Sequence, residues 1–218
     1  MTMTLYHCKD SRSLRPLWAL EEMGMSYDLI ELPFPPRVFK KDYLGVNPLG
    51  TVPYFIDGES AMTESCGICH YLVERYQQYQ LGVRPDHPEY ASYINWLFHS
   101  DATITFPQTI MIRYTLLESD ERKLPQAVAD YRGFFLGRLR LLDAHIKERE
   151  YLVDNRFTIA DICVGYALFL GEQLNMAKHY SPHVLAYLQR LKTRPAFIRA
   201  VDSGEAESMM REVQHAFD

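Results

Sequence analysis

The sequence contains no apolar run long enough to span a bilayer, and its first residues, MTMTLYHCKD, show no charged segment followed by an apolar core. It therefore predicts neither a membrane span nor a secretory signal. Four cysteines among 218 residues are too few for a disulfide scaffold, which indicates a reducing, cytoplasmic setting. Basic residues are not in excess, since 23 Lys and Arg stand against 28 Asp and Glu. A nucleic-acid partner, which normally requires a basic surface, is therefore not expected.

The residues that are present are typical of a globular protein, with 47% hydrophobic and 23% charged. The length suffices for one large domain or two small ones. The N-terminal part alternates strand-like runs with helical patterns, which predicts an α/β layer with a small mixed sheet. The expected strands are Met3–Cys8, Ser26–Leu32, Thr51–Ile56 and Ala61–Met62, and the expected helices are Leu14–Met23, Arg37–Leu44 and one that opens at Thr63–Ser65.

The C-terminal part shows no convincing strand alternation and is predicted to be all-helical. Pro107 is expected to bend or break the first of its helices. The second helix has inward positions at Phe134, Phe135, Leu139, Leu142 and Ile146. The expected helices are Glu89–Glu118, Asp120–Glu150, Ala160–Asn175, Pro182–Lys192 and one from Pro195 into the tail.

The stretch from Asn47 to Tyr76 has the most distinctive local pattern. It begins with the turn Asn47-Pro48-Leu49-Gly50, in which proline fixes φ and glycine accepts angles that other residues disfavour. Pro53 interrupts the next strand, so that strand is expected to lie at a sheet edge or to bend there. Asp57-Gly58 predicts a hairpin, and Glu64-Ser65 opens a helix. The bland interpretation is a plain hairpin followed by a capped helix.

Together, the proline-bearing strand, the hairpin and the Glu-Ser helix start resemble the thioredoxin-like half of the cytosolic glutathione transferases. The resemblance implies that Val52 and Pro53, joined by a cis peptide bond, hold the cysteinyl part of glutathione. It also implies that Glu64 and Ser65 bind the γ-glutamyl end, where free helix N–H groups suit a carboxylate. The implied fold class is an α/β thioredoxin-like N-terminal domain followed by an all-α C-terminal domain.

In this family, a serine, tyrosine or cysteine near the first helix hydrogen-bonds the glutathione sulfur and favours the nucleophilic thiolate. The usual serine position holds Asp10 here, and a carboxylate there would oppose ionisation of the thiol. The following residues resemble a Ser-Arg-x-x-Arg variant of some bacterial and fungal members. Ser11 is therefore the expected thiolate donor, with Arg12 and Ser13 as alternatives. A structural alternative for Ser13 is the N-cap of the helix.

The resemblance also implies a basic residue that meets the glycine carboxylate of glutathione. We assign this role to Lys40, with Arg37 and Lys41 as neighbouring candidates, because the aligned position holds Phe39. A lysine on a short exposed helix is more often simply solvated, and that is the alternative interpretation.

The pocket for an apolar electrophile is expected on the first helix of the C-terminal part. The family places aromatic and polar side chains of this helix at the cleft, and the alternative role of each is core or dimer packing. The candidates in this sequence are His99, Phe106 and Tyr114.

The run Cys66-Gly67-Ile68-Cys69-His70 matches both a redox pair and a c-type haem attachment site. We reject both interpretations, because the pair lies inside the third expected helix and no export signal precedes it. A zinc site is not expected either, since Cys8 and Cys163 are isolated in the sequence. The sequence therefore predicts neither a metal nor a haem, and the two cysteines are expected to be small residues of an amphipathic helix.

Thr158-Ile159-Ala160-Asp161 is the most specific pattern of the C-terminal half. Thr158 can cap a helix while Asp161 accepts from the N–H of the cap, which is the pattern of a capping box. The sixth helix of glutathione transferases begins with the same Thr-x-x-Asp box. The expected role is structural.

The resemblance covers Met3 to about Val201 and implies a homodimeric detoxification enzyme. Its expected domains are 1–78 for glutathione, a linker at 79–87, and 88–218 for the electrophile and the dimer. One alternative keeps the fold but uses glutathione to reduce disulfides or peroxides, because the usual serine position is Asp10. Another is a non-catalytic binding or regulatory module. The expected partners are glutathione and a small apolar electrophile, without nucleic acid or membrane.

Overall fold

The computed structural model describes residues 3–204, which form two compact units. Of the described residues, the first unit comprises 3–82 and 192–204, and the second comprises Val83–Leu191. Residues 205–218, the end of the predicted 88–218 domain, lie outside the described residues. The predicted division into 1–78, 79–87 and 88–218 stays a prediction.

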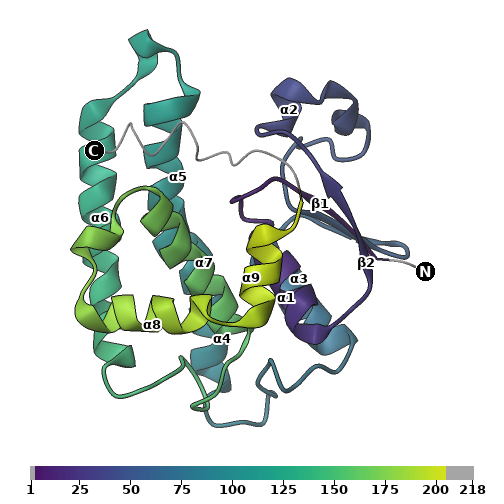
Figure 1. Cartoon of the computed structure of the whole chain (residues 1–218), viewed down its shortest axis with the longest axis vertical. Coiled ribbons are helices and arrows are strands. Elements are labelled where there is room, and N and C mark those ends of the chain that lie inside the picture. Colours follow the sequence, from purple (N-terminus) through teal and green to yellow (C-terminus); the bar gives the residue numbers. More distant parts are fainter. Residues whose placement is uncertain (1–2, 205–218) are drawn as a thin grey trace. The chain divides into compact units, whose positions relative to one another are not determined.

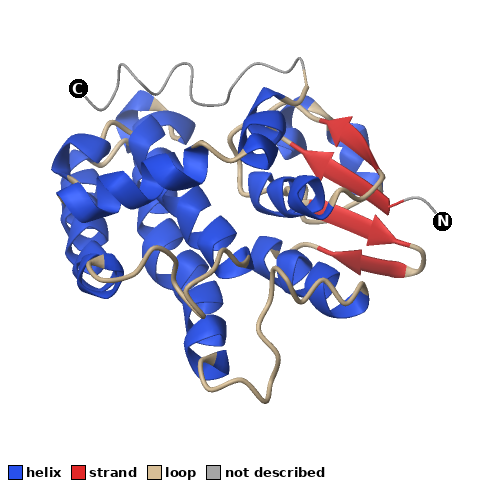
Figure 2. Cartoon of the chain, turned by 60° about the horizontal axis from the view of Figure 1, so that its bottom comes forward, coloured by secondary structure: helices blue, strands red, loops and turns tan. Residues whose placement is uncertain are grey.

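The first unit contains one four-stranded sheet in the order β2-β1-β3-β4 (Figure 2). Its central strand pairs with β2 in parallel, from Met3 opposite Tyr27 to His7 opposite Glu31, and with β3 in antiparallel orientation. The strands are β1 (Met3–His7), β2 (Tyr27–Glu31), β3 (Tyr54–Asp57) and β4 (Ser60–Met62). The predicted mixed sheet and hairpin are confirmed.

Of the two alternatives predicted for the proline-bearing strand, an edge position or a bend at Pro53, the edge position is wrong, because β3 runs between β1 and β4. The paired register of β3 with β1 begins with Tyr54 opposite Tyr6, one residue after Pro53. Pro53 therefore precedes the ladder, and its missing N–H removes no hydrogen bond from the sheet.

Helix α1 (Leu14–Met23) packs against α3 (Ser65–Arg75) and α9 (Pro195–Asp202). The rings of Trp18 and Phe197 meet edge to face at 4.8 Å. Arg194 donates two hydrogen bonds to the Glu22 carboxylate at 2.6 and 2.8 Å, and Arg199 reaches Glu21. In Figure 1 the last helix, in yellow, accordingly lies beside the first, although about 170 residues separate Glu22 from Arg194.

The helix predicted over Arg37–Leu44 is two shorter pieces, α2 (Pro36–Phe39) and the 3₁₀ turn η1 (Lys41–Gly45). Lys40 separates them with φ −136° and ψ 71°, outside the helical region. The break lets Tyr43 turn into the core, where its hydroxyl donates to the Thr51 carbonyl at 2.8 Å. A tertiary contact therefore overrides the local helical pattern.

The second unit is helical, and its first predicted helix, 89–118, changes geometry along its length. Its segments are α4 (Tyr90–Phe98), the π-helical η2 (His99–Thr105), α5 (Phe106–Ile112) and the π-helical η3 (Arg113–Leu117). The Thr105 hydroxyl donates to the Ser100 carbonyl at 2.7 Å, five residues back, which suits the wider π turn. Pro107 follows directly in the first turn of α5, and the residues before it stay helical, so the chain is not broken at this proline.

The remaining helices confirm the predicted helical architecture with small shifts in their bounds. The second predicted helix begins later, at Pro125, after the 3₁₀ turn η4. The elements are η4 (Asp120–Arg122), α6 (Pro125–Ile146), α7 (Ile159–Gln173), the 3₁₀ turn η5 (Ala177–His179) and α8 (Pro182–Lys192). The α/β first unit and the helical second unit together confirm the predicted fold class.

The inward assignment of Phe134 is wrong, since its side chain is 44% exposed. Successive helical residues point about 100° apart, so Phe134 and Phe135 cannot both face the core. Phe135 is the buried one, and the Arg138 guanidinium lies 4.2 Å from the centre of the Phe134 ring.

The capping box at the start of α7 is confirmed. The Asp161 carboxylate accepts from the Thr158 N–H at 2.8 Å, and the Thr158 hydroxyl accepts from the Ala160 N–H at 3.3 Å. Asp161 also accepts from the Leu152 N–H at 3.0 Å and from the Tyr187 hydroxyl at 2.8 Å. Burial nevertheless dominates and raises the pKa of Asp161 to about 6. The box therefore also joins α7 to the preceding loop and to α8.

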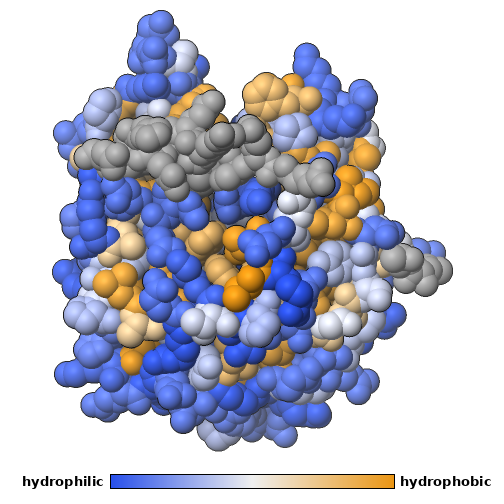
Figure 3. Space-filling model, viewed as in Figure 1, coloured by the Kyte–Doolittle hydropathy of each residue, from blue (hydrophilic) through white to orange (hydrophobic). Residues whose placement is uncertain are grey.

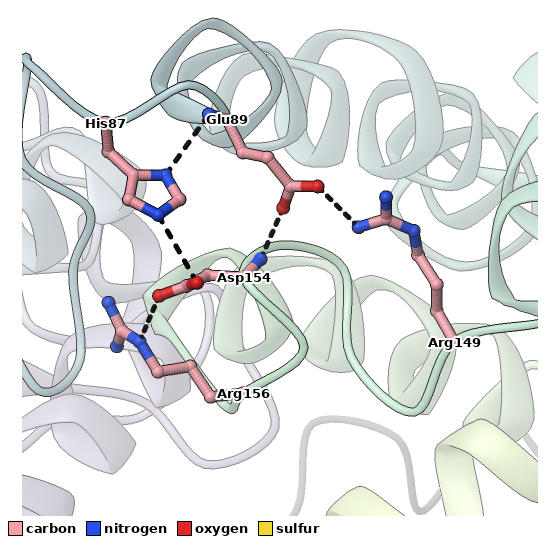
Figure 4. Close-up of polar contacts among 5 residues, drawn as sticks. All are labelled: His87, Glu89, Arg149, Asp154 and Arg156. Carbon is pink, nitrogen blue, oxygen red and sulfur yellow. Dashed lines mark hydrogen bonds and ion pairs between the residues drawn. The ribbon is translucent and has the colours of Figure 1, made fainter.

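A polar cluster of five residues ties the start of α4 to the loop before α7 (Figure 4). Glu89 accepts from Arg149 at 2.8 Å and from the backbone N–H of Asp154, and that N–H lowers the pKa of Glu89. The Asp154 carboxylate accepts from Arg156 at 2.6 Å and lies 3.3 Å from His87 Nε2. Because His87 Nδ1 accepts from the Glu89 N–H, Nε2 is the nitrogen that carries the hydrogen. The cluster binds the backbone N–H groups of Glu89 and Asp154, so its role is structural.

Candidate functional site

The turn before the Val-Pro pair is built around Asn47, which is almost fully buried. Its amide nitrogen donates to the Thr51 carbonyl at 2.9 Å, and its amide oxygen accepts from the Leu49 N–H at 3.1 Å. Gly50 has φ +59°, and a Cβ at this position would stand 2.7 Å from the Cβ of Arg37. Only glycine fits this close approach with a left-handed backbone, so the turn delivers Val52 in a defined position.

The Val52–Pro53 peptide bond is cis, as the resemblance implies. Val52 lies outside the β1–β3 ladder, which starts at Tyr54. Its side chain packs on a small cluster around Cys8, Leu32 and Tyr43. The side chain thus holds Val52 in place, beside the sheet but not paired within it.

The start of α3 presents the Glu-Ser pair in two different environments. Glu64 is exposed at the N-cap position with an extended backbone, and it accepts from the Thr63 hydroxyl at 3.3 Å. Ser65 is buried, and its hydroxyl accepts from Arg15 Nη1 at 2.9 Å. The carboxylate therefore stays available to solvent while the serine faces the first helix.

Arg15 was not among the predicted site residues, yet its side chain is fully buried between the starts of α1 and α3. A buried guanidinium requires hydrogen-bond partners, and Ser65 supplies one of them. The signal was present in the sequence as the second arginine of the Ser-Arg-x-x-Arg pattern. The pattern does not indicate which residue Arg15 bonds to, because Ser65 lies 50 residues further along the chain.

The first loop brings the side chains of its two serines within hydrogen-bonding distance of each other. Ser11 Oγ lies 2.7 Å from Ser13 Oγ, and Ser13 Oγ lies 2.8 Å from His7 Nδ1. Ser13 occupies the N-cap position of α1 but makes no side-chain capping bond, so the N-cap interpretation is wrong in this respect. Its hydroxyl instead accepts from the Cys8 N–H at 3.2 Å, since the chain before it turns back at Asp10, where φ is +62°.

Two groups beside this loop have strongly shifted pKa values. The pKa of His7 is lowered to about 4, mainly by burial and also by the charge of Lys9, while a hydrogen bond from the imidazole to the backbone of Ser13 opposes both. Burial raises the pKa of Cys8 to about 12. At neutral pH, His7 is therefore an uncharged imidazole and Cys8 is a thiol, not a thiolate.

The shift at His7 predicts a pH dependence of stability. The unfolded chain binds a proton on His7 below about pH 6.5, whereas the folded chain does so only near pH 4, so stability falls as the pH drops through this window. Relative to His7→Asn, the wild type should lose about 2–3 kcal/mol of unfolding free energy between pH 7 and pH 4.5. Urea unfolding of both proteins measures the difference, in which the carboxyl titrations cancel. A pH-independent difference would contradict an uncharged His7.

The predicted ligand of the glycine carboxylate, Lys40, is exposed at the end of α2, and its neighbours Arg37 and Lys41 are exposed as well. Hydrophobic side chains lie in the same region, where Figure 3 shows orange atoms at the position of α2. They belong to exposed residues of α2, η1 and the following turn: Val38, Phe39, Leu44, Val46 and Leu49. The basic residues are accessible, and their geometry does not select one of them.

The predicted pocket residues of the second unit do not share one hollow. His99 lines a hollow of about 460 Å³ with Phe134 and Arg138, whereas Tyr114 lines another of about 420 Å³ between η3 and α6. Phe106 lines neither and is half-exposed beside Tyr131, with ring centres 6.4 Å apart. The ring of His99 packs against Trp96, and burial lowers its pKa.

Cys66 and Cys69 lie inside α3, one turn apart, as expected from the sequence. Cys69 is buried and Cys66 is partly buried. Within residues 3–204, no three His, Cys, Asp or Glu side chains are grouped as a metal site requires. None of the helices in that range has both the length and the apolar character needed to cross a bilayer.

Known proteins match both parts of the chain. Residues 1–74 match the family model of the glutathione S-transferase N-terminal domain, and residues 107–195 match that of the C-terminal domain. Over 216 residues the chain is 31% identical to glutathione S-transferase 2 of Schizosaccharomyces pombe, covering 88% of this chain and 92% of that protein. It is 25% identical to tetrachloro-p-hydroquinone reductive dehalogenase of Sphingobium chlorophenolicum, covering 85% and 89%. A solved glutathione transferase from Methylococcus capsulatus has a TM-score of 0.81 at 25% identity, covering 93% of this chain and 98% of that one.

Proposed function

The chain belongs to the glutathione S-transferase family, and we propose that it joins glutathione to a small apolar electrophile. In this proposal Val52 and Pro53 hold the cysteinyl part, Glu64 and Ser65 hold the γ-glutamyl part, and Lys40 meets the glycine carboxylate. Ser11 donates a hydrogen bond to the sulfur, and His99, Phe106 and Tyr114 of the second unit are candidates for the electrophile pocket.

The observation that carries the proposal is the hydrogen bond between Arg15 and Ser65, 2.9 Å long and buried. It fastens the start of α1, which follows Ser11, to the start of α3, which carries Glu64. One small peptide can therefore meet both helix starts. The unpaired N–H groups and positive dipole end of each helix favour the two anionic ends of such a ligand, the thiolate and the γ-glutamyl carboxylate.

Ser11 is preferred over Ser13 as the thiolate donor because of their exposure. Ser11 keeps 4% of its surface accessible, whereas Ser13 keeps none and already bonds to the backbone and to His7. Arg12, the other alternative, is only partly buried and adds positive charge near the loop without replacing a hydroxyl donor. A bound thiol can meet Ser11 without rearrangement of the loop.

The chemistry is an attack by the thiolate. The thiol, with an ordinary pKa near 8.5, loses its proton to solvent, and the Ser11 hydroxyl stabilises the resulting anion. The sulfur electron pair forms the bond to the electrophilic carbon, and the displaced group leaves with the pair that bound it. Binding both reactants on one protein supplies the proximity.

Replacement of Ser11 tests this assignment. Ser11→Ala removes the donor, so the pKa of the bound thiol should rise by about 1 and turnover with a chloro-nitrobenzene at pH 6.5 should fall about tenfold or more. Glutathione affinity, measured by calorimetry, should change little, because the γ-glutamyl and glycine ends are untouched. Ser11→Thr, which keeps the hydroxyl, is the matched control. If Ser11→Ala turns over the substrate at the wild-type rate, another residue must donate the hydrogen bond to the thiolate.

A second candidate, reduction by glutathione, is supported by the similarity to a reductive dehalogenase. The cysteine that follows β1, Cys8, is a buried thiol with its pKa raised to about 12, so a reduction here would use glutathione thiols alone. Parallel assays with bis-hydroxyethyl disulfide and a chloro-nitrobenzene separate the two activities. A preference for the disulfide would favour reduction, and no heat of glutathione binding would favour a non-catalytic module.

We also propose that the protein is a cytoplasmic homodimer. The second unit exposes several large apolar side chains on α4, α5 and α6, and a second copy of the chain could cover them. They are Phe98, Phe106, Phe134 and Leu141. Sedimentation equilibrium measures the assembly directly, and a monomer mass at micromolar concentration would contradict it.

A further inference from the structure

Three buried side chains at the end of β1 form a continuous hydrogen-bonded chain. Ser11 Oγ and Ser13 Oγ are 2.7 Å apart, and Ser13 Oγ and His7 Nδ1 are 2.8 Å apart. Two backbone N–H groups also point into it: that of Cys8 donates to Ser13 Oγ at 3.2 Å, and that of Ser13 donates to Ser11 Oγ at 3.3 Å. Both serines are therefore held from several sides.

The number of hydrogens limits how this chain is arranged. A hydroxyl has one hydrogen to donate and two lone pairs that accept. One lone pair of Ser13 is used by the Cys8 N–H. The Cys8 carbonyl lies 3.3 Å from Ser13 Oγ and is a third possible acceptor, but the contacts to Ser11 and His7, at 2.7 and 2.8 Å, are shorter. We therefore assign the Ser13 hydrogen to one of these two side chains, and Ser13 accepts from the other. The chain consequently runs either from His7 towards Ser11 or from Ser11 towards His7.

We propose that His7 is a positioning residue that sets this direction: its uncharged imidazole donates from Nδ1 to Ser13, Ser13 donates to Ser11, and the Ser11 hydroxyl is left to donate to a bound thiolate. The inference rests on the proposed function and adds a residue to it. No proton is transferred along the chain; only the orientation of the hydroxyl hydrogens is fixed.

The lone-pair count at Ser11 supports this direction. Ser11 Oγ then accepts from both the hydroxyl and the backbone N–H of Ser13, so its two lone pairs are filled and its hydrogen is free for the ligand. In the reverse direction Ser11 donates inward, and a lone pair would face the thiolate, which repels an anion. A thiolate at Ser11 and a donating His7 therefore stabilise one another.

The low pKa of His7 fits the same arrangement. An imidazole that stays uncharged at neutral pH has only one N–H, so its tautomer decides which way the chain runs. The charge of Lys9, the neighbouring titratable group, helps to keep His7 uncharged. A purely structural His7 would fill the end of β1 without any effect on the thiol.

Two substitutions separate the positioning role from packing. His7→Leu removes the donor, whereas His7→Asn keeps an N–H at the position of Nδ1. For His7→Leu we expect the pKa of enzyme-bound glutathione, titrated by the ultraviolet absorbance of its thiolate, to rise by about 1. Turnover at pH 6.5 should fall about tenfold and recover at high pH, while glutathione affinity stays the same. His7→Asn should restore most of the wild-type thiol pKa.

The matched control is Val73→Ala, which removes buried packing from α3 without touching the hydroxyl chain. It should lower thermal stability and leave the thiol pKa unchanged. A wild-type thiol pKa in His7→Leu, or no difference between His7→Leu and His7→Asn, would overturn the inference. Failure of the wild type to bind glutathione would instead contradict the proposed function.

A measurement on the unliganded wild type covers the case in which His7→Leu does not fold. Nitrogen-15 NMR of histidine-labelled protein distinguishes the two tautomers of an uncharged imidazole. A hydrogen on Nδ1 of His7 supports the proposed direction, and a hydrogen on Nε2 alone overturns it. The tautomer is read without any ligand, so this result does not depend on activity.

Discussion

Asp161→Ala is expected to lower the unfolding free energy at pH 7 by about 3 kcal/mol. Four donors bond to the Asp161 carboxylate, and one of them, the Thr158 hydroxyl, can rotate away. The substitution leaves the other three buried without this acceptor: the N–H groups of Leu152 and Thr158 and the hydroxyl of Tyr187. Each orphaned donor costs about 1–3 kcal/mol, or about 6 in total. Removal of a buried carboxylate whose pKa is raised from 3.8 to about 6 returns about 3 kcal/mol. The loss of acceptors therefore outweighs the relief of desolvation.

Urea unfolding measures this effect, and Thr158→Ala is its control. The Thr158 hydroxyl accepts from the Ala160 N–H at 3.3 Å and donates to Asp161 at 3.2 Å. Thr158→Ala leaves Asp161 with its three other donors, so it should cost only about 1 kcal/mol. If Asp161→Ala loses no more unfolding free energy than Thr158→Ala, Asp161 acts only as part of the helix cap. This result would mean that Leu152 and Tyr187 find other partners.

Glu64→Ala is expected to weaken glutathione binding about 100-fold. The carboxylate is exposed at the start of α3, beside the buried Ser65 and Arg15 pair, where it can meet the ammonium of a γ-glutamyl group. A charge-assisted hydrogen bond of this kind contributes about 1.5–3 kcal/mol, which is 10- to 150-fold in affinity. Calorimetry with glutathione measures the dissociation constant.

The control for Glu64→Ala is Glu59→Ala, which removes the same charge from an exposed position in the β3–β4 hairpin. It should leave the affinity nearly unchanged, because exposed charges at a distance are screened by solvent and salt. Unchanged binding by Glu64→Ala would move the γ-glutamyl site away from the start of α3. If both variants lose the same affinity for glutathione, the loss reflects the change in net charge and not a contact made by Glu64.

The sequence by itself determined the features that depend on neighbouring residues. The Asn-Pro turn, the Asp-Gly hairpin, the Glu-Ser helix start and the Thr158–Asp161 box all appear where predicted, because each is set by backbone preferences within a few residues. The same local signals carried the family resemblance and the fold class. Helix bounds were accurate to a few residues where prolines or caps mark them, as at Pro182 and Pro195.

Only the tertiary structure decided which partners these residues meet. Arg15 bonds to Ser65 across 50 residues and Ser13 bonds to His7 instead of capping α1, and no local pattern encodes either choice. Burial explains the other differences from the prediction. Tyr43 turns inward, which splits a predicted helix, and Phe135 faces the core while Phe134 is exposed. Local preferences differ by about 1 kcal/mol or less, whereas burying a large side chain or satisfying a buried charge is worth several times more, so the packed fold prevails wherever the two conflict.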